Sequence, residues 1–297
     1  MIDIVFVILN FNIVDETIEC IESIEQNLDT DSFRIIVVDN GSERKIVNKL
    51  REKLENYCKV ELIISNDNLG FAKGNNIGIQ ASQIYHPKFV ACINNDTLLQ
   101  QKNFFQILEA KYNQYSSAII GPKILLKDGS EQHRTAKPLS IESYKKLIQK
   151  FESHSDDMKT RIFERLKQIK FIRFSYDRLF SKTRNGREKY YSEIENVILH
   201  GCFLIFTPKF FTHLNGFNER TFLYMEEEFL YIDTRMNGLT TLYTPDLWIR
   251  HLEDVSTDAI LSNYAEKRAF VKKHHLQSLK SLVKYMEDNT EQIKGVL

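Results

Sequence analysis

The sequence predicts an α/β protein with a doubly wound, mostly parallel central sheet and helices on both faces of that sheet. Apolar runs of strand length alternate with amphipathic helical stretches along the first third of the chain, which is the pattern of repeated strand-helix-strand units. These runs are continuously apolar, as buried parallel strands are. Each run also stops at asparagine or aspartate, as strands do when their carboxyl ends open into a ligand crevice.

Composition limits the class of protein. The chain has 297 residues, of which 42% are hydrophobic and 27% charged, so it can bury the core of one large globular domain. Lys+Arg and Asp+Glu are 40 each, and this balance gives no general attraction to nucleic acid. The four cysteines are far apart, as reduced core residues of a cytosolic protein are. No basic leader and no apolar run of the roughly 20 residues of a membrane span is present, so we expect a cytoplasmic protein.

Local patterns place the elements in order. The spacing of Ile18, Ile21 and Ile24 gives the first helix one buried stripe. In the first half, strands are predicted over residues 4–9, 33–38, 60–64 and 89–93, and helices over 15–27, 46–57 and 77–84. In the second half, strands are predicted over 119–125, 197–208, 221–224 and 240–243, and helices over 209–217, 226–237 and 263–285.

Polar side chains follow each of the early strands. Asn12, Asp39, Asn68 and Asp96 stand just beyond four strand ends, and such ends meet at one edge of a parallel sheet. We therefore expect a rim that holds a nucleotide. Asp39 is the candidate to accept a hydrogen bond from the base or ribose. The alternative is that Asp39 caps the helix that begins near Glu43.

Asp96 is predicted to be an exposed aspartate next to Asn94 and Asn95. Carboxylate and amide oxygens are the ligands that hard divalent cations prefer. The alternative is a loop in which these side chains make turns or cap a helix that begins near Gln100.

Three glycines at spacings of four, Gly70, Gly74 and Gly78, precede or begin the third predicted helix. They would let the backbone approach a phosphate or sugar closely. The stretch is neither G-x-G-x-x-G nor a P-loop, so the common phosphate-binding motifs are excluded.

Three consecutive carboxylates, Glu226, Glu227 and Glu228, follow an aromatic stretch. In a dry site they repel one another, which raises one pKa or recruits a cation. One of them could act as a general base. The alternative is the first turn of an ordinary helix, where acidic residues are favoured by the helix dipole.

Taken together, VVDNGS at 37–42, NLGFAKGNNIGI at 68–79 and INNDT at 93–97 resemble the motifs of the inverting family 2 glycosyltransferases, and of their rhamnosyltransferase-like branch in particular. The resemblance implies a GT-A fold, a nucleotide-diphosphate sugar donor and a divalent metal, Mn²⁺ or Mg²⁺, held by an Asp-x-Asp motif. Asn94 stands at the first acidic position of that motif, so Asp96 is the implied metal ligand.

The resemblance also assigns roles to single residues. The Glu-Asp motif of the family matches Glu226-Glu227, which implies Glu227 as the general base and Glu226 as its orienting or acceptor-binding partner. Trp248 to His251 with Ser256 resembles a late HxxxxS element, in which His251 is a metal or diphosphate ligand and Arg250 a phosphate contact. The residues expected to bind the nucleotide sugar are Asn10, Asn12, Asp39, Asn68, Gly70, Lys73, Asn75 and Asn95.

The expected organisation is a GT-A domain over residues 1–262 and a C-terminal helical tail over 263–297. The domain consists of a nucleotide-sugar half at about 1–130, a helical basic insert at about 140–190 and an acceptor half at about 195–262. In the insert, residues 145–185 interleave basic and aromatic side chains. They are expected to contact an anionic membrane peripherally, or else to form an ordinary solvated face.

The expected function is transfer of a sugar from a nucleotide-diphosphate donor to a glycan or lipid-linked acceptor, with inversion, in cell-surface polysaccharide synthesis at the inner face of the membrane. One alternative is a sugar nucleotidyltransferase, which would have a glycine-rich basic signature where Asn10-Phe11-Asn12 stands. Another is a non-catalytic subunit that binds a nucleotide sugar or glycan, to which Asn94 points. The sequence leaves the oligomeric state open.

Overall fold

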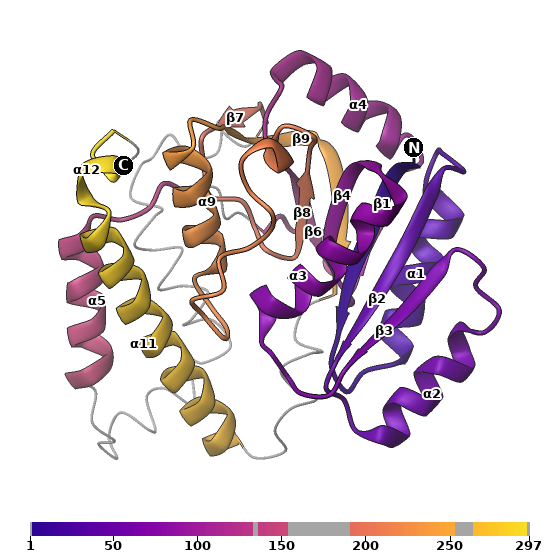
Figure 1. The fold of residues 1–297 in the computed structure, drawn as a ribbon, viewed down its shortest axis with the longest axis horizontal. Helices are drawn as coiled ribbons and strands as arrows, with labels where there is room; N and C mark the ends of the chain where they lie inside the picture. Colours follow the sequence, from indigo (N-terminus) through magenta and orange to yellow (C-terminus); the bar gives the residue numbers. More distant parts are fainter. Residues whose placement is uncertain (1, 133–135, 154–190, 253–263, 296–297) are drawn as a thin grey trace.

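The computed structural model describes residues 2–132, 136–153, 191–252 and 264–295, with side chains of the last range from 269 on. A mixed sheet runs through the middle of the molecule, with helices on both faces (Figure 1). The predicted fold class is confirmed.

The described strands form one sheet in the order β3-β2-β1-β4-β8-β6-β9-β5, and β7 pairs with β9. Strands β3, β2, β1 and β4 are parallel to one another. Strand β8 is antiparallel to β4 and β6, and β9 is parallel to β6. The strands are β1 (Ile2–Asn10), β2 (Phe33–Asn40), β3 (Val60–Ser65), β4 (Pro87–Asn94), β5 (Thr97–Leu98), β6 (Ile119–Leu126), β7 (Ile194–Glu195), β8 (Phe203–Phe206) and β9 (Thr241–His251). The strand order reverses at β1, which lies between β2 and β4, so a crevice is expected beyond its carboxyl end.

Successive side chains of β1 point to opposite faces of the sheet and so join different cores. Ile4, Phe6 and Ile8 pack with α1 (Asp15–Asn27), α2 (Arg44–Leu54) and α4 (Phe104–Tyr115). Val5 and Val7 pack with α3 (Phe71–Ser82) and the short helix η2 (Phe210–Thr212) on the other face. A further short helix, η1 (Gln83–Tyr85), follows α3.

Helix α3 begins at Phe71, earlier than the predicted start at Ile77. Its glycines face protein atoms: an added Cβ would meet Leu9 at Gly74 and Val7 at Gly78, at 2.5 and 2.3 Å. The spacing of four therefore puts small residues on the helix face that packs against the sheet. Gly74 and Gly78 let α3 pack closely against β1. The prediction that they approach a phosphate or sugar is therefore wrong for these two glycines.

Three strand predictions in the second half need correction. Strand β8 covers only Phe203–Phe206, because residues 200–202 form a turn. Residues 221–224 are a loop and not a strand. Strand β9 continues to His251. Pro122 of β6 lies opposite Thr244 of β9, and the next residue, Lys123, lies opposite Trp248. The residues around Pro245 therefore form a bulge, and the pairing continues beyond it.

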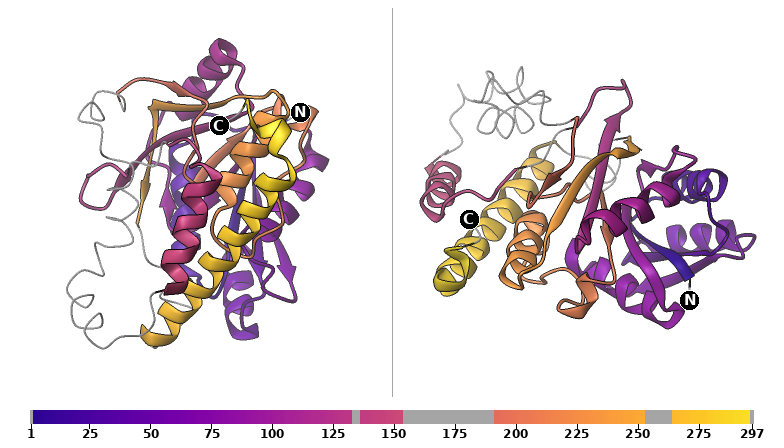
Figure 2. Two further views of the ribbon diagram at one scale, coloured as in Figure 1. Left: turned by 90° about the vertical axis from the view of Figure 1, so that its left-hand side faces the viewer. Right: turned by 90° about the horizontal axis from the view of Figure 1, so that it is seen from above.

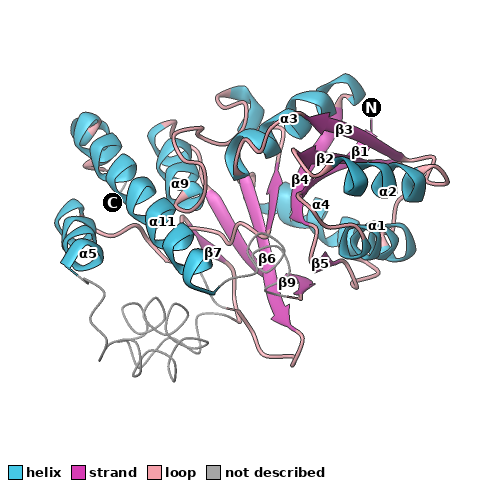
Figure 3. Cartoon of the chain, turned by 90° about the horizontal axis from the view of Figure 1, so that it is seen from below, coloured by secondary structure: helices cyan, strands magenta, loops and turns pink. Residues whose placement is uncertain are grey.

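A helical layer at the other end of the molecule from α2 contains α5 (Ile141–Ser153), α9 (Glu226–Met236), α11 (Tyr264–Asp288) and α12 (Thr290–Ile293). Helices α5 and α11 lie side by side in every view (Figures 1, 2 and 3). Ion pairs of 2.6 Å join Lys145 to Glu287 and Lys280 to Glu152 across them. Helix α5 begins the predicted insert, and the rest of that insert, with most of the predicted membrane segment, lies outside the described residues.

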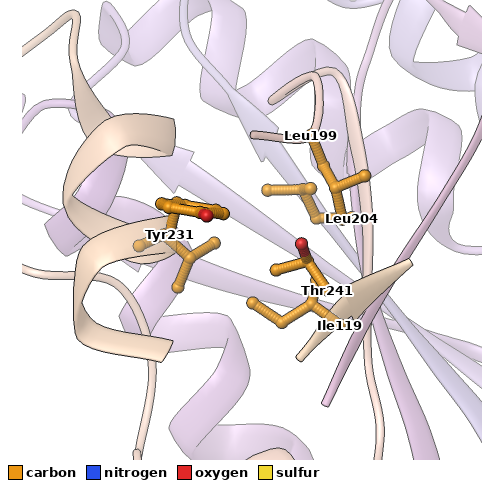
Figure 4. Close-up of a pocket in the computed structure, with 6 residues that line it drawn as sticks. Ile119, Leu199, Leu204, Tyr231 and Thr241 are labelled. Atoms are coloured by element: carbon orange, nitrogen blue, oxygen red, sulfur yellow. The ribbon is translucent and has the colours of Figure 1, made fainter. Parts of the chain in front are cut away.

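A void of about 10 Å³ lies between α9 and the sheet (Figure 4) and is about as large as one water molecule needs. Its lining is Ile119, Leu199, Leu204, Leu230, Tyr231 and Thr241. Helix α9 thus packs on the sheet through apolar side chains, which sets the position of its N-terminus. Within the described ranges, no helix is both long and apolar enough to cross a bilayer.

Candidate active site

A buried polar network lies at the carboxyl ends of β1, β2 and β4. Asn10 donates from Nδ2 to Oδ2 of Asp39 over 2.8 Å. Thr17 of α1 donates to Oδ1 of Asn10 over 2.9 Å, and Asn95 donates from Nδ2 to the Thr17 hydroxyl over 3.2 Å. The structure therefore brings together three of the predicted donor-site residues from three adjacent strand ends.

Asp39 is fully buried, and both of its carboxylate oxygens accept hydrogen bonds within the chain. Oδ1 accepts from the backbone N–H of Ser42 over 3.0 Å, ahead of the helix that Asp39 was an alternative candidate to cap. Asn12 has a left-handed backbone, with φ of 55°. It donates its N–H to Oγ of Ser42, and its Oδ1 accepts from the N–H of Glu43. Asn12 is thus tied to Ser42, whose N–H in turn donates to Asp39.

Asn68 belongs to a separate network on the other face of the sheet. Asn40, next to Asp39 on β2, points to that face and donates from Nδ2 to Oδ1 of Asn68 over 3.1 Å. Asn40 also accepts the N–H of Leu69, and Asn68 accepts the N–H of Gly70. The predicted rim is therefore divided, with Asn12 and Asp39 on one side of β2 and Asn68 on the other.

Helix α3 carries the remaining predicted donor residues. Gly70 precedes the helix with φ of +85°, and a Cβ there would lie 2.1 Å from the carbonyl oxygen of Phe222. Lys73 is exposed in the first turn. Asn75 is buried and donates to the carbonyl of Phe71 within the same helix, so it serves the helix itself.

Asp96 is buried, with 4% of its surface exposed, contrary to the prediction that it is exposed. The reason is the antiparallel pairing of β5 with β9, which places Thr97 opposite His251. Oδ1 of Asp96 lies 3.2 Å from Nε2 of His251. The contact lacks hydrogen-bond geometry, so Oδ1 is a buried oxygen without a hydrogen-bond partner.

The donor atoms of Asp96 and His251 make this pair a fit for a cation. Nδ1 of His251 lies 3.1 Å from Oε1 of Gln132, which can accept a hydrogen bond from it. Nε2 is the ring nitrogen that faces the Asp96 carboxylate and would be the metal ligand of the ring. Two cis ligands of an octahedral ion at 2.0–2.1 Å would be roughly 3 Å apart, which is close to the observed separation. The described residues contain no group of three His, Cys, Asp or Glu around one point.

The loop before α9 has an uncommon backbone. Tyr224 and Met225 are left-handed, with φ of 76° and 70°. Non-glycine residues pay on the order of 1–3 kcal/mol each for such a conformation. The turn reverses the chain so that α9 begins at Glu226, and all three carboxylates lie in its first turn, as the helix prediction expected.

The three carboxylates differ in burial. Glu226 and Glu228 are each 4% exposed, whereas Glu227 is partly exposed. Burial, and then the charge of Glu227, raises the pKa of Glu226 to about 8. Glu226 is therefore protonated at neutral pH, while its Oε1 accepts the hydroxyl of Thr221 over 2.9 Å.

The turn at His200-Gly201 joins the two sides of the site. Oε1 of Glu227 accepts the N–H of Gly201 over 3.2 Å, and a Cβ on Gly201 would lie 2.8 Å from that oxygen. The rings of His200 and His251 are 5.9 Å apart, edge to face. Glu227 is thus linked through this turn to the pair of His251 and Asp96.

The raised pKa of Glu226 predicts how stability depends on pH. The folded state retains a proton that the unfolded chain releases above pH 4.5, so this contribution falls as pH rises from 4.5 to about 8. The stability of wild type relative to Glu226→Gln is expected to decline by up to about 1.4 kcal/mol per pH unit in that interval. Urea unfolding of both proteins from about pH 5 to pH 8 gives their free energies of unfolding. If these free energies changed with pH in the same way in both proteins, the raised pKa of Glu226 would be contradicted.

Several residues of the site were not among the predicted ones. His200 lies inside the predicted strand 197–208, Thr17 lies inside the predicted helix 15–27, and Asn40 is the residue after Asp39. The signal for Asn40 was available, since alternate residues at a strand end face opposite sides. Thr17 and His200 depend on contacts between distant segments, which local patterns do not encode.

Comparison with known proteins identifies a family and a similar fold. The family model described as glycosyl transferase family 2 matches residues 5–180. The fold is similar to that of S. aureus TarS 1–349 in complex with UDP-GlcNAc, with a TM-score of 0.53 and 14% identity over 89% of this chain and 62% of that one. A second structure of S. aureus TarS 1–349 has a TM-score of 0.51 and 13% sequence identity. That comparison covers 98% of this chain and 74% of the TarS chain.

The chain thus spans less than two thirds of the first of these TarS structures. No curated protein matches the sequence. The family model nevertheless covers more than half of the chain and includes the strand ends that carry Asn10, Asp39 and Asp96. The chain therefore belongs to glycosyl transferase family 2.

Proposed function

We propose that the chain transfers a sugar from a nucleotide-diphosphate donor to a glycan or lipid-linked acceptor, with inversion, in the synthesis of cell-surface polysaccharide. The observation that supports this most is the link from Glu227 through the His200-Gly201 turn to the pair of Asp96 and His251. This link favours a site in which Glu227 serves the nucleophile and a cation held by Asp96 and His251 would serve the leaving group.

The proposed donor site is the edge of the sheet beyond β1, β2 and β4. Asp39 is the proposed acceptor for the base or ribose, in addition to the hydrogen bonds that it accepts from Asn10 and Ser42. The TarS structure contains UDP-GlcNAc, so a uridine nucleotide is the first donor to test. The motif resemblance to the rhamnosyltransferase-like branch makes a nucleotide-linked rhamnose the second.

A divalent ion, Mn²⁺ or Mg²⁺, would be held by Asp96 and His251, and would supply positive charge for the leaving diphosphate. Gln132 would accept a hydrogen bond from Nδ1 of His251, which would leave Nε2 available as a ligand. Donor phosphates and water would supply the other ligands, as is usual for Mg²⁺.

Glu227 is proposed as the general base. It removes the proton of the acceptor hydroxyl, whose oxygen attacks the anomeric carbon, while the bond from that carbon to the diphosphate oxygen breaks. Glu226, whose pKa burial raises to about 8, is protonated at neutral pH and so does not compete for the proton of the acceptor. The Gly201 N–H orients the Glu227 carboxylate.

The test is release of nucleoside diphosphate from a panel of nucleotide sugars, with and without Mn²⁺ or Mg²⁺. Release that depends on the metal is expected for a transferase. Tight donor binding without release would support a non-catalytic binding subunit instead. Formation of a nucleotide sugar from a nucleoside triphosphate and a sugar phosphate would support the nucleotidyltransferase alternative.

Asp39→Asn is expected to weaken UDP binding by about 10-fold to 100-fold, since a hydrogen bond to a charged group contributes roughly 1.5–3 kcal/mol. The amide oxygen can still accept the Ser42 N–H, but the amide NH2 then faces Nδ2 of Asn10, so the melting temperature of the variant is measured alongside its UDP affinity. Titration calorimetry with UDP measures the change, and Asp15→Asn on the exposed face of α1 is the matched control. Equal UDP affinity in Asp39→Asn and wild type would remove Asp39 from the donor site.

A further inference from the structure

The left-handed turn at Tyr224 and Met225 sets the direction of helix α9. The carbonyl of Met225 accepts the N–H of Phe229 over 3.1 Å, so this residue is already part of the first helical turn. A strained turn persists only where its surroundings fix it. Whatever holds the turn therefore also holds Glu227, two residues further along the chain.

The C-terminal helix α11 supplies contacts to this turn. Ser278 donates its hydroxyl to the carbonyl of Leu223 over 2.7 Å. The rings of His275 and Tyr224 are stacked, with centroids 4.2 Å apart and planes at 21°. One turn of α11 thus contacts two consecutive residues of the loop, one through its backbone and one through its side chain.

The residues on either side of these two are held by the same helix. The ring of Phe222 lies 4.8 Å from that of His274. Met225 is 1% exposed and belongs to a cluster that includes Leu279 and Val283 of α11. Every residue from 222 to 225 therefore packs against or bonds to α11.

The same loop reaches the donor side of the site. The carbonyl of Phe222 accepts the N–H of Phe71, the first residue of α3, over 2.9 Å. It also lies against Gly70, where no side chain would fit. The loop thus connects the predicted donor residue Gly70 with the first turn of α9.

We infer that His275 and Ser278 are positioning residues for Glu227, and that α11 is a working part of the active site. This inference rests on the proposed role of Glu227 as the base. His275 also stacks on Phe151 of α5, with centroids 5.7 Å apart and planes at 12°. Helix α5, where the predicted insert begins, therefore contacts the histidine ring that stacks on Tyr224.

The variants that test this are Ser278→Ala and His275→Leu. The matched control is Ser281→Ala, which makes the same change one turn along α11. Ser281 lies 3.4 Å from the carbonyl of Arg220, in an exposed contact outside the 222–225 loop. His275→Phe is the conservative variant, because it keeps an aromatic ring against Tyr224.

The first measurement is hydrogen exchange at two amides. The Gly201 N–H donates to the Glu227 side chain and the Phe229 N–H to Met225, so both report the position of the turn. Their exchange is expected to be about tenfold faster in Ser278→Ala and His275→Leu, with amides of β1 and β2 unchanged. Ser281→Ala and His275→Phe are expected to exchange as wild type does. Unchanged exchange in Ser278→Ala would overturn the inference.

The second measurement is UDP release from UDP-GlcNAc with Mn²⁺. A positioning role predicts a loss of about tenfold in kcat with KM for the donor within about twofold, whereas general destabilisation would lower the melting temperature instead. A wild-type protein that releases no UDP would contradict the proposed use of this donor, and the exchange rates would still decide the inference. If His275→Leu does not fold, Ser278→Ala and His275→Phe provide the comparison.

Discussion

Glu227→Gln is expected to lower the rate of sugar transfer by about 10²-fold to 10⁴-fold, the usual contribution of a general base. Donor affinity should be unchanged, because the role proposed for Glu227 is on the acceptor. The amide oxygen of glutamine can still accept the Gly201 N–H, so the first turn of α9 keeps its place. Single-turnover measurements at saturating donor separate the chemical step from product release.

The matched control is Glu228→Gln, which changes the next residue of the same helical turn. Glu228 is buried at 4% exposure, whereas Glu227 is partly exposed, so Glu228→Gln is expected to stay within a few-fold of wild type. If Glu227→Gln retained more than about a tenth of the wild-type rate while folded, another carboxylate would be the base. A large loss in Glu228→Gln alone would identify that residue.

Asp96→Asn is expected to weaken Mn²⁺ binding in the presence of UDP by more than about 100-fold, and to remove metal-dependent turnover with it. It replaces the only carboxylate of the proposed pair and leaves a neutral ligand beside His251. The effect should exceed the 10-fold to 100-fold that loss of an outer-shell partner typically causes. Electron paramagnetic resonance of free Mn²⁺ gives the affinity without any need for activity.

Two further variants make the metal experiment decisive. His251→Gln removes the second ligand and is expected to weaken Mn²⁺ binding as well. Asp128→Asn changes an exposed aspartate in the turn after β6 and should bind Mn²⁺ as wild type does. If Asp96→Asn bound the ion as tightly as Asp128→Asn, the ion would lie elsewhere.

Local patterns predicted the first half of the fold closely. Helix α1 has the predicted bounds, because the spacing of its isoleucines and polar residues can be recognised within the segment itself. The strands of the parallel region begin or end within a few residues of the predictions, since each apolar run is bounded by turn-forming residues. The strand ends that carry Asn10, Asp39 and Asp96 could be recognised for the same reason.

The remainder depends on contacts between distant segments. The burial of Asp96 follows from the pairing of β5 with β9, and no pattern near Asp96 encodes it. The aromatic stretch at 221–224 has the composition of a strand, but contacts with α11 hold it as a loop with two left-handed residues at its end. Tertiary packing thus overrides local preference at the two places where the site is assembled.

The pairing of β5 with β9 also sets an order of assembly. The network of Asn10, Asp39 and Asn95 is complete once the first four strands have associated. The pair of Asp96 and His251 requires β9, the last of the described strands in chain order. A chain synthesised only as far as β8 can therefore form the network of Asn10, Asp39 and Asn95 but lacks His251. If Asp96 and His251 hold Mn²⁺ as proposed, binding of the ion would report that β9 has joined the sheet.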